Sequence, residues 1–169
     1  RPSQLQGKFI YDPIFVDEDM ATLKEWCDPT DPRPLVVEIG FQQGIFAKAY
    51  CEKNPDCRYL GFEVRKKFCQ DTNERLEKVG IENARIALVD ARQVLRPLIE
   101  EGSLDTLFAF FPDPWWKKKH MKKRLVSEYF ATMAADLLKE HGRLVVKSDV
   151  EGYADWAEES MRAEERFLV

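Results

Sequence analysis

Short apolar runs that alternate with segments of helical periodicity constrain the fold of this chain more than any other feature of its sequence. Each run is rich in β-branched or aromatic residues and is bounded by Gly, Pro or acidic residues, which is typical of buried strands; the runs are "LVVEIG" (35–40), "RYLGFE" (58–63), "ARIALVD" (84–90), "LDTLFAFF" (104–111) and "GRLVVKSD" (142–149). Apolar residues recur at helical spacing in the segments 45–54, 65–79, 91–100, 127–139 and 150–161. Strands that alternate with helices form a parallel sheet with crossover helices. The sequence therefore predicts an α/β fold with a mostly parallel central sheet and helices on both faces.

The length of 169 residues is that of one ordinary domain, which can bury a core without disulfides or metal ions. Residues 1–34 are predicted to form an N-terminal extension that consists of a loop and one helix near 17–26, packed on the domain or reaching towards a partner. The domain itself is expected to span 35–169. Because the chain starts at Arg1 rather than Met, we expect the given sequence to be trimmed.

The helix predicted for 127–139 has a recognisable start and a recognisable apolar face. Ser127 is a candidate N-cap, because its hydroxyl can accept a hydrogen bond from a free N–H of the first turn. The residues predicted to be buried on this helix are Tyr129, Phe130, Met133, Ala134, Leu137 and Leu138. His141 is expected in the turn that precedes the last strand.

Acidic residues stand at or beside the ends of four successive predicted strands: Glu38, Glu63, Asp90 and Asp113. In an open parallel sheet, ligands bind beyond the carboxyl ends of the strands. Glu63 can accept hydrogen bonds from the two hydroxyls of a ribose, and Asp90 can accept one from the exocyclic amine of an adenine. A single acid of this kind would be read as a helix cap or a loop residue. Four in register favour a nucleoside-binding site.

The first turn, "EIGFQQG", has Gly40 and Gly44 but Gln42 where a dinucleotide-binding fingerprint has its middle glycine. That middle glycine lets the backbone approach a pyrophosphate, so its absence disfavours a pyrophosphate ligand. The turn leaves room for a ligand without one, such as S-adenosylmethionine. An ordinary strand-to-helix turn would have the same glycines.

Positive charge is concentrated in "FFPDPWWKKKHMKKR" (110–124). The segment 117–124 has six Lys/Arg and no acid, whereas the whole chain has a formal net charge of −4. The remainder therefore has 20 basic against 30 acidic residues. A polyanion could bind this part of a protein that is acidic elsewhere. The competing interpretation is a solvated charged surface.

Five motifs in order give the chain a specific resemblance. These are the "EIGFxxG" turn, "GFEV" at the end of the second strand, "DA" after the third, the F-P-D-P-W segment followed by basic residues, and "SDVEGYA" (148–154). Over roughly residues 35–160 the chain resembles the tRNA (guanine-N7)-methyltransferase family. The resemblance implies a Rossmann-like class I methyltransferase fold, S-adenosylmethionine as cofactor, tRNA as partner, and 7-methylguanosine in the variable loop as product.

Site residues follow from matching positions. The resemblance places Glu38, Gly40, Glu63, Asp90 and Asp113 on the family's cofactor contacts, and we add Gly44 and Ala91 to that set. Asp113 is also the implied catalytic residue. Lys117 and Asp149 match positions that face the substrate RNA, and we expect four further residues of the basic run to contact it too, namely Lys118, His120, Lys122 and Arg124.

The implied reaction makes modest demands on the protein. Guanine N7 has an in-plane lone pair and needs no deprotonation, so aligning it with the methyl group can supply several kcal/mol, of the order of the ~7–11 available to well-oriented reactions. A fixed carboxylate would stabilise the positive charge that reaches the purine. Asp113 is held between Pro112 and Pro114, which restrict the backbone on both sides. The alternative is that Asp113 only caps a turn.

The two tryptophans that follow allow two interpretations. Trp115 and Trp116 could stack on an unpaired base, which is worth roughly 1–3 kcal/mol per base. They could instead seal the loop against the domain, which we expect of at least one of them.

Two departures from the family pattern leave an alternative open. Gln42 and Gln43 stand in a loop where the family commonly has a further glycine, and a bulkier loop could narrow the methionine end of the pocket. The family's T-x-[FY]-E motif is absent up to Val169, so either the given sequence is truncated or the guanine pocket is incomplete. The alternative is a catalytically impaired RNA-binding module on the same fold. A nucleotide-dependent oxidoreductase is disfavoured by the missing middle glycine and by the basic run.

The cysteines and the hydropathy of the sequence indicate in which cellular compartment the protein is expected. Cys27, Cys51, Cys57 and Cys69 form no C-x-x-C pair and stand near no His cluster, so we expect reduced, structural cysteines and no metal site rather than disulfides or zinc. No run approaches the ~20 apolar residues that span a bilayer, and no signal peptide is recognisable. We expect a cytoplasmic protein that acts as a monomer or a homodimer, away from membranes.

Overall fold

The computed structural model describes residues 5–6, 9–10 and 17–169, with side chains described from Met20 onward. A single sheet with the strand order β1-β2-β5-β4-β3-β6-β7 runs through the molecule. Its five principal strands are β3 (Leu35–Ile39), β4 (Arg58–Glu63), β5 (Ala84–Leu88), β6 (Leu104–Phe110) and β7 (Leu138–Lys147), and all pairings among them are parallel. These strands confirm the five that the sequence predicts.

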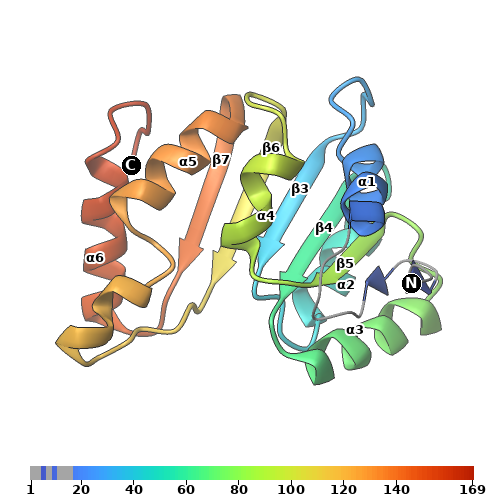
Figure 1. Ribbon diagram of the computed structural model, residues 1–169, viewed down its shortest axis with the longest axis horizontal. Helices are drawn as coiled ribbons and strands as arrows, with labels where there is room; N and C mark the ends of the chain where they lie inside the picture. Colours follow the sequence, from blue (N-terminus) through green and yellow to red (C-terminus); the bar gives the residue numbers. More distant parts are fainter. Residues whose placement is uncertain (1–4, 7–8, 11–16) are drawn as a thin grey trace.

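Helices cover both faces of the sheet (Figure 1). They are α1 (Asp17–Trp26), α2 (Ile45–Lys53), α3 (Lys66–Lys78), α4 (Ala91–Leu98), α5 (Glu128–Leu137) and α6 (Glu151–Arg162), with a 3₁₀ helix η1 (Lys118–Lys123) before α5. The core is split accordingly. One cluster joins the sheet to α1, α4, α5 and α6, and the other joins it to α2 and α3. All four cysteines are buried and unpaired.

Part of the N-terminal region joins the sheet, which the sequence did not predict. The helix near 17–26 is confirmed as α1. The rest was expected to be loop, but β1 (Leu5–Gln6) and β2 (Phe9–Ile10) form an antiparallel pair, and β2 extends the sheet by pairing in parallel with β5. Strands of two residues are too short to show an alternating pattern, so no periodicity in the sequence predicts them.

The last strand begins earlier than predicted. β7 starts at Leu138 rather than near 142, and its register against β6 shifts between Leu104 and Thr106. His141 has φ 66°, a left-handed conformation, so the turn expected at this residue is an irregularity inside the strand. In the helix before it, Ser127 Oγ accepts a hydrogen bond from the Phe130 N–H at 3.2 Å, which confirms the predicted N-cap.

One residue of the predicted apolar face of α5 is wrongly assigned. Tyr129 is 69% exposed, and its ring faces the Arg96 guanidinium at 5.9 Å. The side chains that do enter the core, Phe130, Met133, Ala134 and Leu137, follow the helical repeat from Phe130, and Tyr129 lies about 100° away from that face. No helix among the described residues is long and apolar enough to span a membrane.

Strand order defines where a ligand can bind. From β3 the chain proceeds outward through β4 to β5, then returns to the other side of β3 with β6 and β7. The order therefore reverses between β3 and β6. In open α/β sheets, the crevice beyond the carboxyl ends at such a reversal is the usual ligand site.

Candidate active site

A cleft of about 520 Å³ opens at the carboxyl ends of β3, β4, β5 and β6. Ligand sites of proteins are commonly about 300–1,000 Å³, so the cleft is large enough for a nucleoside. Of the residues that the sequence assigns to a cofactor, those that line the cleft are Gly40, Glu63, Asp90, Ala91 and Asp113. Gln42, Arg65, Arg92, Trp115 and Lys123 also line it.

Glu63 is the most firmly held acid of the cleft. It is the last residue of β4 and is 6% exposed. One carboxylate oxygen accepts the backbone N–H groups of Val64 at 2.8 Å and Arg65 at 3.0 Å, and the other accepts that of Gln42 at 3.1 Å. A carboxylate offers about four acceptor positions, so one remains for a ligand hydroxyl. Glu63 thus joins the turns after β3 and β4 and presents a fixed acceptor to the cleft.

The two glycines of the first turn have different roles. Gly40 lines the cleft with φ 75°, and a Cβ built there would meet nothing within 4 Å, so backbone conformation rather than space favours glycine. Gly44 is buried outside the lining, and a Cβ there would lie 2.3 Å from Thr72 Cγ2 on α3. Gly44 therefore allows α2 to pack closely on α3, and its predicted contact with a cofactor has no direct geometric support.

Gln42 and Gln43 leave the cleft open. Both are exposed, and their carbonyl oxygens accept hydrogen bonds from α3, from Thr72 Oγ1 at 3.1 Å and Arg75 Nε at 2.9 Å respectively. Gln42 has φ 50°, a conformation that glycine adopts without strain. The loop is thus held in the shape that a glycine would favour, by hydrogen bonds that α3 donates to it and by the one that the Gln42 N–H donates to Glu63.

Glu38 lies beneath the cleft rather than in it. Its side chain is 2% exposed, is absent from the lining, and accepts a hydrogen bond from the Tyr59 hydroxyl on β4. Burial raises the pKa of Glu38 to about 7, against the opposing effect of the Tyr59 hydrogen bond. The pair links β3 to β4 within the core, so the predicted cofactor contact of Glu38 also lacks direct geometric support.

Asp90 is engaged by its neighbour. It caps α4 by accepting the Arg92 backbone N–H at 3.0 Å, and the Arg92 guanidinium contacts both of its carboxylate oxygens at 2.5–3.1 Å. Hydrogen bonds from Arg92 lower the pKa of Asp90. Asp90 can therefore accept the predicted hydrogen bond from an adenine amine only if Arg92 moves aside.

Asp113 stands in a backbone segment with unusual torsions. Its side chain is exposed and lines the cleft opposite the β4 wall. Phe111 and Trp115, on either side of the Pro-Asp-Pro, have φ 51° and 43°, which bulky residues rarely adopt. Backbone strain of this kind clusters at functional sites, where the surrounding structure must hold it in place.

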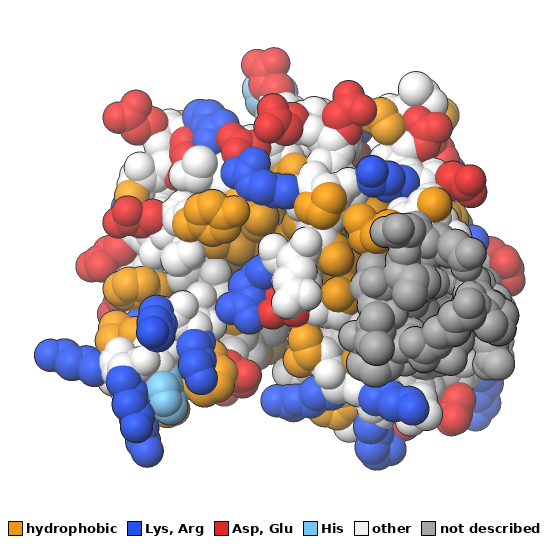
Figure 2. Space-filling view, viewed as in Figure 1, with side chains coloured by type: hydrophobic (Ala, Val, Ile, Leu, Met, Phe, Trp, Pro, Cys, Tyr) orange, Lys and Arg blue, Asp and Glu red, His pale blue; other side chains and the backbone are white. Residues whose placement is uncertain are grey.

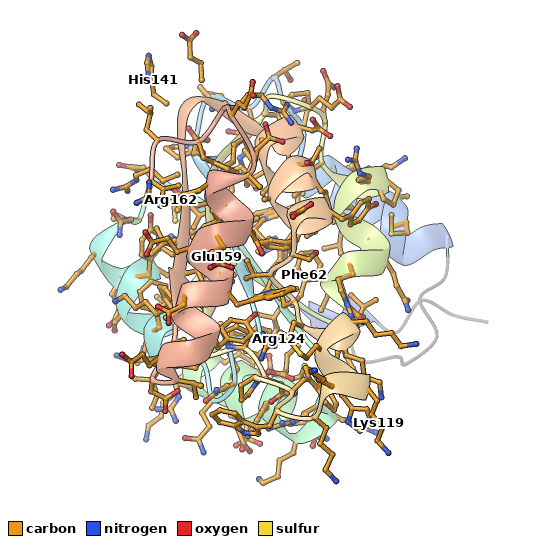
Figure 3. All side chains as sticks on the ribbon, turned by 90° about the vertical axis from the view of Figure 1, so that its left-hand side faces the viewer. Phe62, Lys119, Arg124, His141, Glu159 and Arg162 are labelled. Carbon is orange, nitrogen blue, oxygen red and sulfur yellow. The ribbon has the colours of Figure 1, made fainter. Side chains whose placement is uncertain are left out.

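The basic run forms η1, which the sequence did not predict. Lys117, Lys118 and Lys122 are exposed and lie outside the lining, whereas Lys123 lines the cleft with its ammonium 5.0 Å from the Trp115 ring centroid. Lys119 points away from the protein near η1 (Figure 3). Lys123 was missed because its direction depends on the 3₁₀ repeat, which a run of lysines does not reveal.

The aromatic residues beside η1 differ in burial. Trp115 is half-buried in the cleft wall and meets the His120 ring edge-on, with the centroids 5.6 Å apart. Trp116 is 71% exposed. Trp116 therefore faces solvent, whereas the ring contacts of Trp115 lie within its own loop, so sealing of the loop against the domain stays a prediction.

The Arg124 side chain makes its contacts within the protein. Its Nε donates to the Pro114 carbonyl oxygen at 2.9 Å, and its guanidinium lies 5.5 Å from the Tyr153 ring and 5.1 Å from the Trp156 ring of α6. Figure 3 shows Arg124 beside α6, above Lys119. These contacts tie the Asp113 segment to α6, so Arg124 as placed is not free to meet RNA phosphates. Asp149 is exposed beyond β7, at the same sheet edge but outside the lining.

Comparison with a solved structure defines the class of fold. Precorrin-6y C5,15-methyltransferase from Geobacter metallireducens GS-15 matches with a TM-score of 0.63 over 95% of this chain and 76% of that chain, at 15% sequence identity. Together with the parallel sheet, this match shows the class I, S-adenosylmethionine-dependent methyltransferase fold that the sequence predicts. Among the described residues, no three His, Cys, Asp or Glu side chains gather as metal ligands.

The chain belongs to the family described as "Putative methyltransferase", which matches residues 32–169. The tRNA (guanine-N(7)-)-methyltransferase of Myxococcus xanthus (strain DK1622) is 36% identical over 118 residues, which are 70% of this chain and 57% of that protein. The protein of the same name from Methylobacillus flagellatus is 32% identical over 154 residues, which are 91% of this chain and 62% of that protein. These relatives confirm the resemblance seen in the motifs. The chain spans 57% and 62% of their respective lengths.

Proposed function

We propose that the protein transfers a methyl group from S-adenosylmethionine to N7 of a guanosine in the variable loop of tRNA. The observation that supports this most is one cleft that has Glu63 on the β4 wall, Asp113 on the opposite wall, and η1 beside Asp113. A fixed acceptor suits a ribose, a second carboxylate suits a developing positive charge, and a basic surface suits a polynucleotide.

The cofactor fits the β4 side of the cleft. Glu63 has an acceptor position for a ribose hydroxyl, Gly40 leaves open space beside it, and Ala91 with Asp90 forms the wall beyond. When bound, S-adenosylmethionine supplies an electrophilic methyl group on a sulfonium. The residues of the chain then have to orient this methyl group and keep competing nucleophiles away.

The guanine fits the β6 side, next to Asp113, Trp115 and Lys123. Trp115 offers an aromatic surface for the purine, and Asp113 can stabilise the positive charge as it arrives on the ring. No general base is required at N7. The exposed lysines of η1 would bind the backbone of the RNA. We also propose that the enzyme is cytoplasmic and acts on tRNA as a monomer or a homodimer.

The alternative of an impaired RNA-binding module loses its main support. It required Gln42 and Gln43 to close the pocket, but both are exposed and a cleft of about 520 Å³ remains beside them.

The proposed function is tested by cofactor binding and by product mapping on the full-length protein. Calorimetry should show binding of S-adenosylmethionine and none of NAD. Incubation with unmodified tRNA and the cofactor should yield 7-methylguanosine in the variable loop. Binding of tRNA with no cofactor binding at millimolar concentration would favour the module instead, and binding of NAD would favour an oxidoreductase.

Arg124→Lys is expected to lower kcat for methyl transfer by about tenfold and to change tRNA affinity by less than about twofold. Lysine keeps the charge but cannot reproduce the contacts of the planar guanidinium with the Tyr153 and Trp156 rings together with the hydrogen bond to the Pro114 carbonyl oxygen. A tenfold fall in kcat corresponds to an increase of about 1.4 kcal/mol in the activation free energy, which we attribute to poorer positioning of the Asp113 segment. Turnover and filter binding separate the two effects, with Arg162→Lys, the same change at an exposed position of α6, as the control. A fall in tRNA affinity with unchanged kcat would instead make Arg124 a phosphate contact.

A further inference from the structure

A second group of basic side chains lies on the other side of the cleft from η1. Arg65, Lys66 and Lys67 follow β4 consecutively, and all three are exposed. We call these three residues the second basic rim. They lie far from 117–124 in the sequence, and the chain as a whole has a net charge of −4, so this local excess of positive charge is not a consequence of overall composition.

The position of the second basic rim is unfavourable for stability. Lys66 and Lys67 occupy the first turn of α3, which has no acidic residue. Cations at this end of a helix oppose its dipole, and each such contact is worth about 0.3–1 kcal/mol. The placement therefore requires an explanation other than the stability of α3.

The positive charges of the second basic rim are only partly neutralised by the residues that the structure describes. Lys67 pairs with Asp71 at 3.0 Å in an exposed i,i+4 contact. The Arg65 guanidinium lies 5.3 Å from the centroid of the Phe68 ring, and it forms no ion pair with any residue that the structure describes. Lys66 makes no hydrogen bond or ion pair with the part of the chain that the structure describes. Among the described residues, Arg65 and Lys66 thus have no carboxylate partner, and the exposed Lys67–Asp71 pair is weak enough for a phosphate to replace Asp71.

The second basic rim is continuous with the cleft. Val64 and Arg65 line the cleft on the β4 side, and Trp115 and Lys123 line it on the side of η1. Figure 2 shows blue Lys and Arg side chains along the lower edge of the molecule, where the strands of Figure 1 end, in two groups on either side of a hollow. Most of the red acidic side chains in this view lie towards the upper edge and the flanks.

We propose that Arg65, Lys66 and Lys67 bind the phosphate backbone of the RNA on the opposite side of the target nucleotide from η1. A nucleotide inside a chain keeps a phosphate on each side, so when its base enters the cleft the backbone continues in two directions. The basic surface of η1 accommodates only one of them. The second basic rim meets the other, and the two groups together fix how the strand crosses the cleft. The proposal rests on the proposed function, because it assumes an RNA substrate in this cleft.

The test uses the double variant Lys66→Gln/Lys67→Gln, because neither residue lines the cleft. The matched control is Lys53→Gln/Lys78→Gln, which removes the same charge from the last turns of α2 and α3. Affinity for unmodified tRNA is measured by filter binding at several salt concentrations. Each phosphate contact contributes about 0.9 to the salt slope, so two lost contacts should weaken binding roughly tenfold or more near 0.1 M salt and flatten the slope by about two units.

Several outcomes would overturn the proposal. Wild-type affinity and slope in the Lys66/Lys67 variant would do so, and so would an equal loss in the Lys53/Lys78 control, which would indicate a non-specific effect of net charge. The proposal would also be wrong if the wild-type protein did not bind tRNA. Failure of the proposed function is distinguishable, because a wild-type protein that binds tRNA but forms no 7-methylguanosine fails as a methyltransferase while its salt slope still tests the second basic rim.

Discussion

Replacing Asp113 with Asn is expected to lower kcat for methylation of tRNA by about 10²–10³-fold, with tRNA affinity changed by less than about threefold. The amide has nearly the same shape, so Pro112, Pro114 and the bond from Arg124 to the Pro114 carbonyl can hold the segment as before. What is lost is the negative charge that faces the cleft. Positive charge reaches the purine as the methyl group arrives, and a neutral side chain stabilises it much less. Single-turnover methylation with saturating cofactor measures this step directly.

The control for this prediction is Asp56→Asn. Asp56 is exposed in the loop between α2 and β4, at the amino-terminal edge of the sheet and away from the cleft. The same chemical change there should leave kcat unaltered. An unchanged single-turnover rate for the Asp113 variant would contradict the catalytic role. A loss of tRNA affinity equal to the loss of rate would make Asp113 a binding residue instead.

The fold could be predicted because its signal is repeated. Five apolar runs that alternate with helical segments leave few arrangements, and the right-handed crossovers of parallel sheets restrict them further. Two details had no such signal. The two-residue β2 depends on pairing with β5, and the early start of β7 depends on the left-handed backbone of His141. Both are decided by tertiary contacts rather than by local pattern.

The site was predictable where strand ends decide it and unpredictable where side-chain direction does. Glu63 ends β4 and Asp113 lies just beyond β6, and both reach the cleft because residues at or directly after the carboxyl end of a parallel strand lie at the sheet edge. Glu38 lies within β3 and turns into the core instead. Arg124 belongs to the basic run, but two aromatic residues of α6 draw it inward. Such partners lie about 30 residues away, and no local pattern in the sequence indicates them.

Arg58 is another basic residue whose role depends on distant partners. It is the first residue of β4 and is 2% exposed. Its guanidinium donates to the carbonyl oxygens of Trp26, Asp28, Asp31 and Arg33 at 2.8–3.2 Å. Its Nε also lies 3.7 Å from the Asp31 carboxylate. One side chain thus provides hydrogen-bond donors for the carbonyl oxygens at the end of α1 and in the loop that leads into β3.

Arg58→Met is therefore expected to lower the free energy of unfolding by about 3–5 kcal/mol. Methionine fills much of the space but leaves four carbonyl oxygens of a partly buried network without their donor, and each unsatisfied buried group costs about 1–3 kcal/mol before water or rearrangement compensates it. For a domain of this size the midpoint of thermal unfolding should fall by roughly 10 °C. Urea and thermal unfolding followed by circular dichroism measure both quantities.

Two companion variants make the Arg58 prediction specific. Arg58→Lys keeps the charge and up to three donors, so its loss should be smaller than that of Arg58→Met but still measurable. Arg162→Met removes an arginine whose exposed i,i+4 pair with Glu158 is worth only about 0.3–0.5 kcal/mol, and it should unfold almost as the wild type does. If Arg58→Met lost less than about 1 kcal/mol, water would be replacing the guanidinium, and the connection between α1 and β3 would not depend on it.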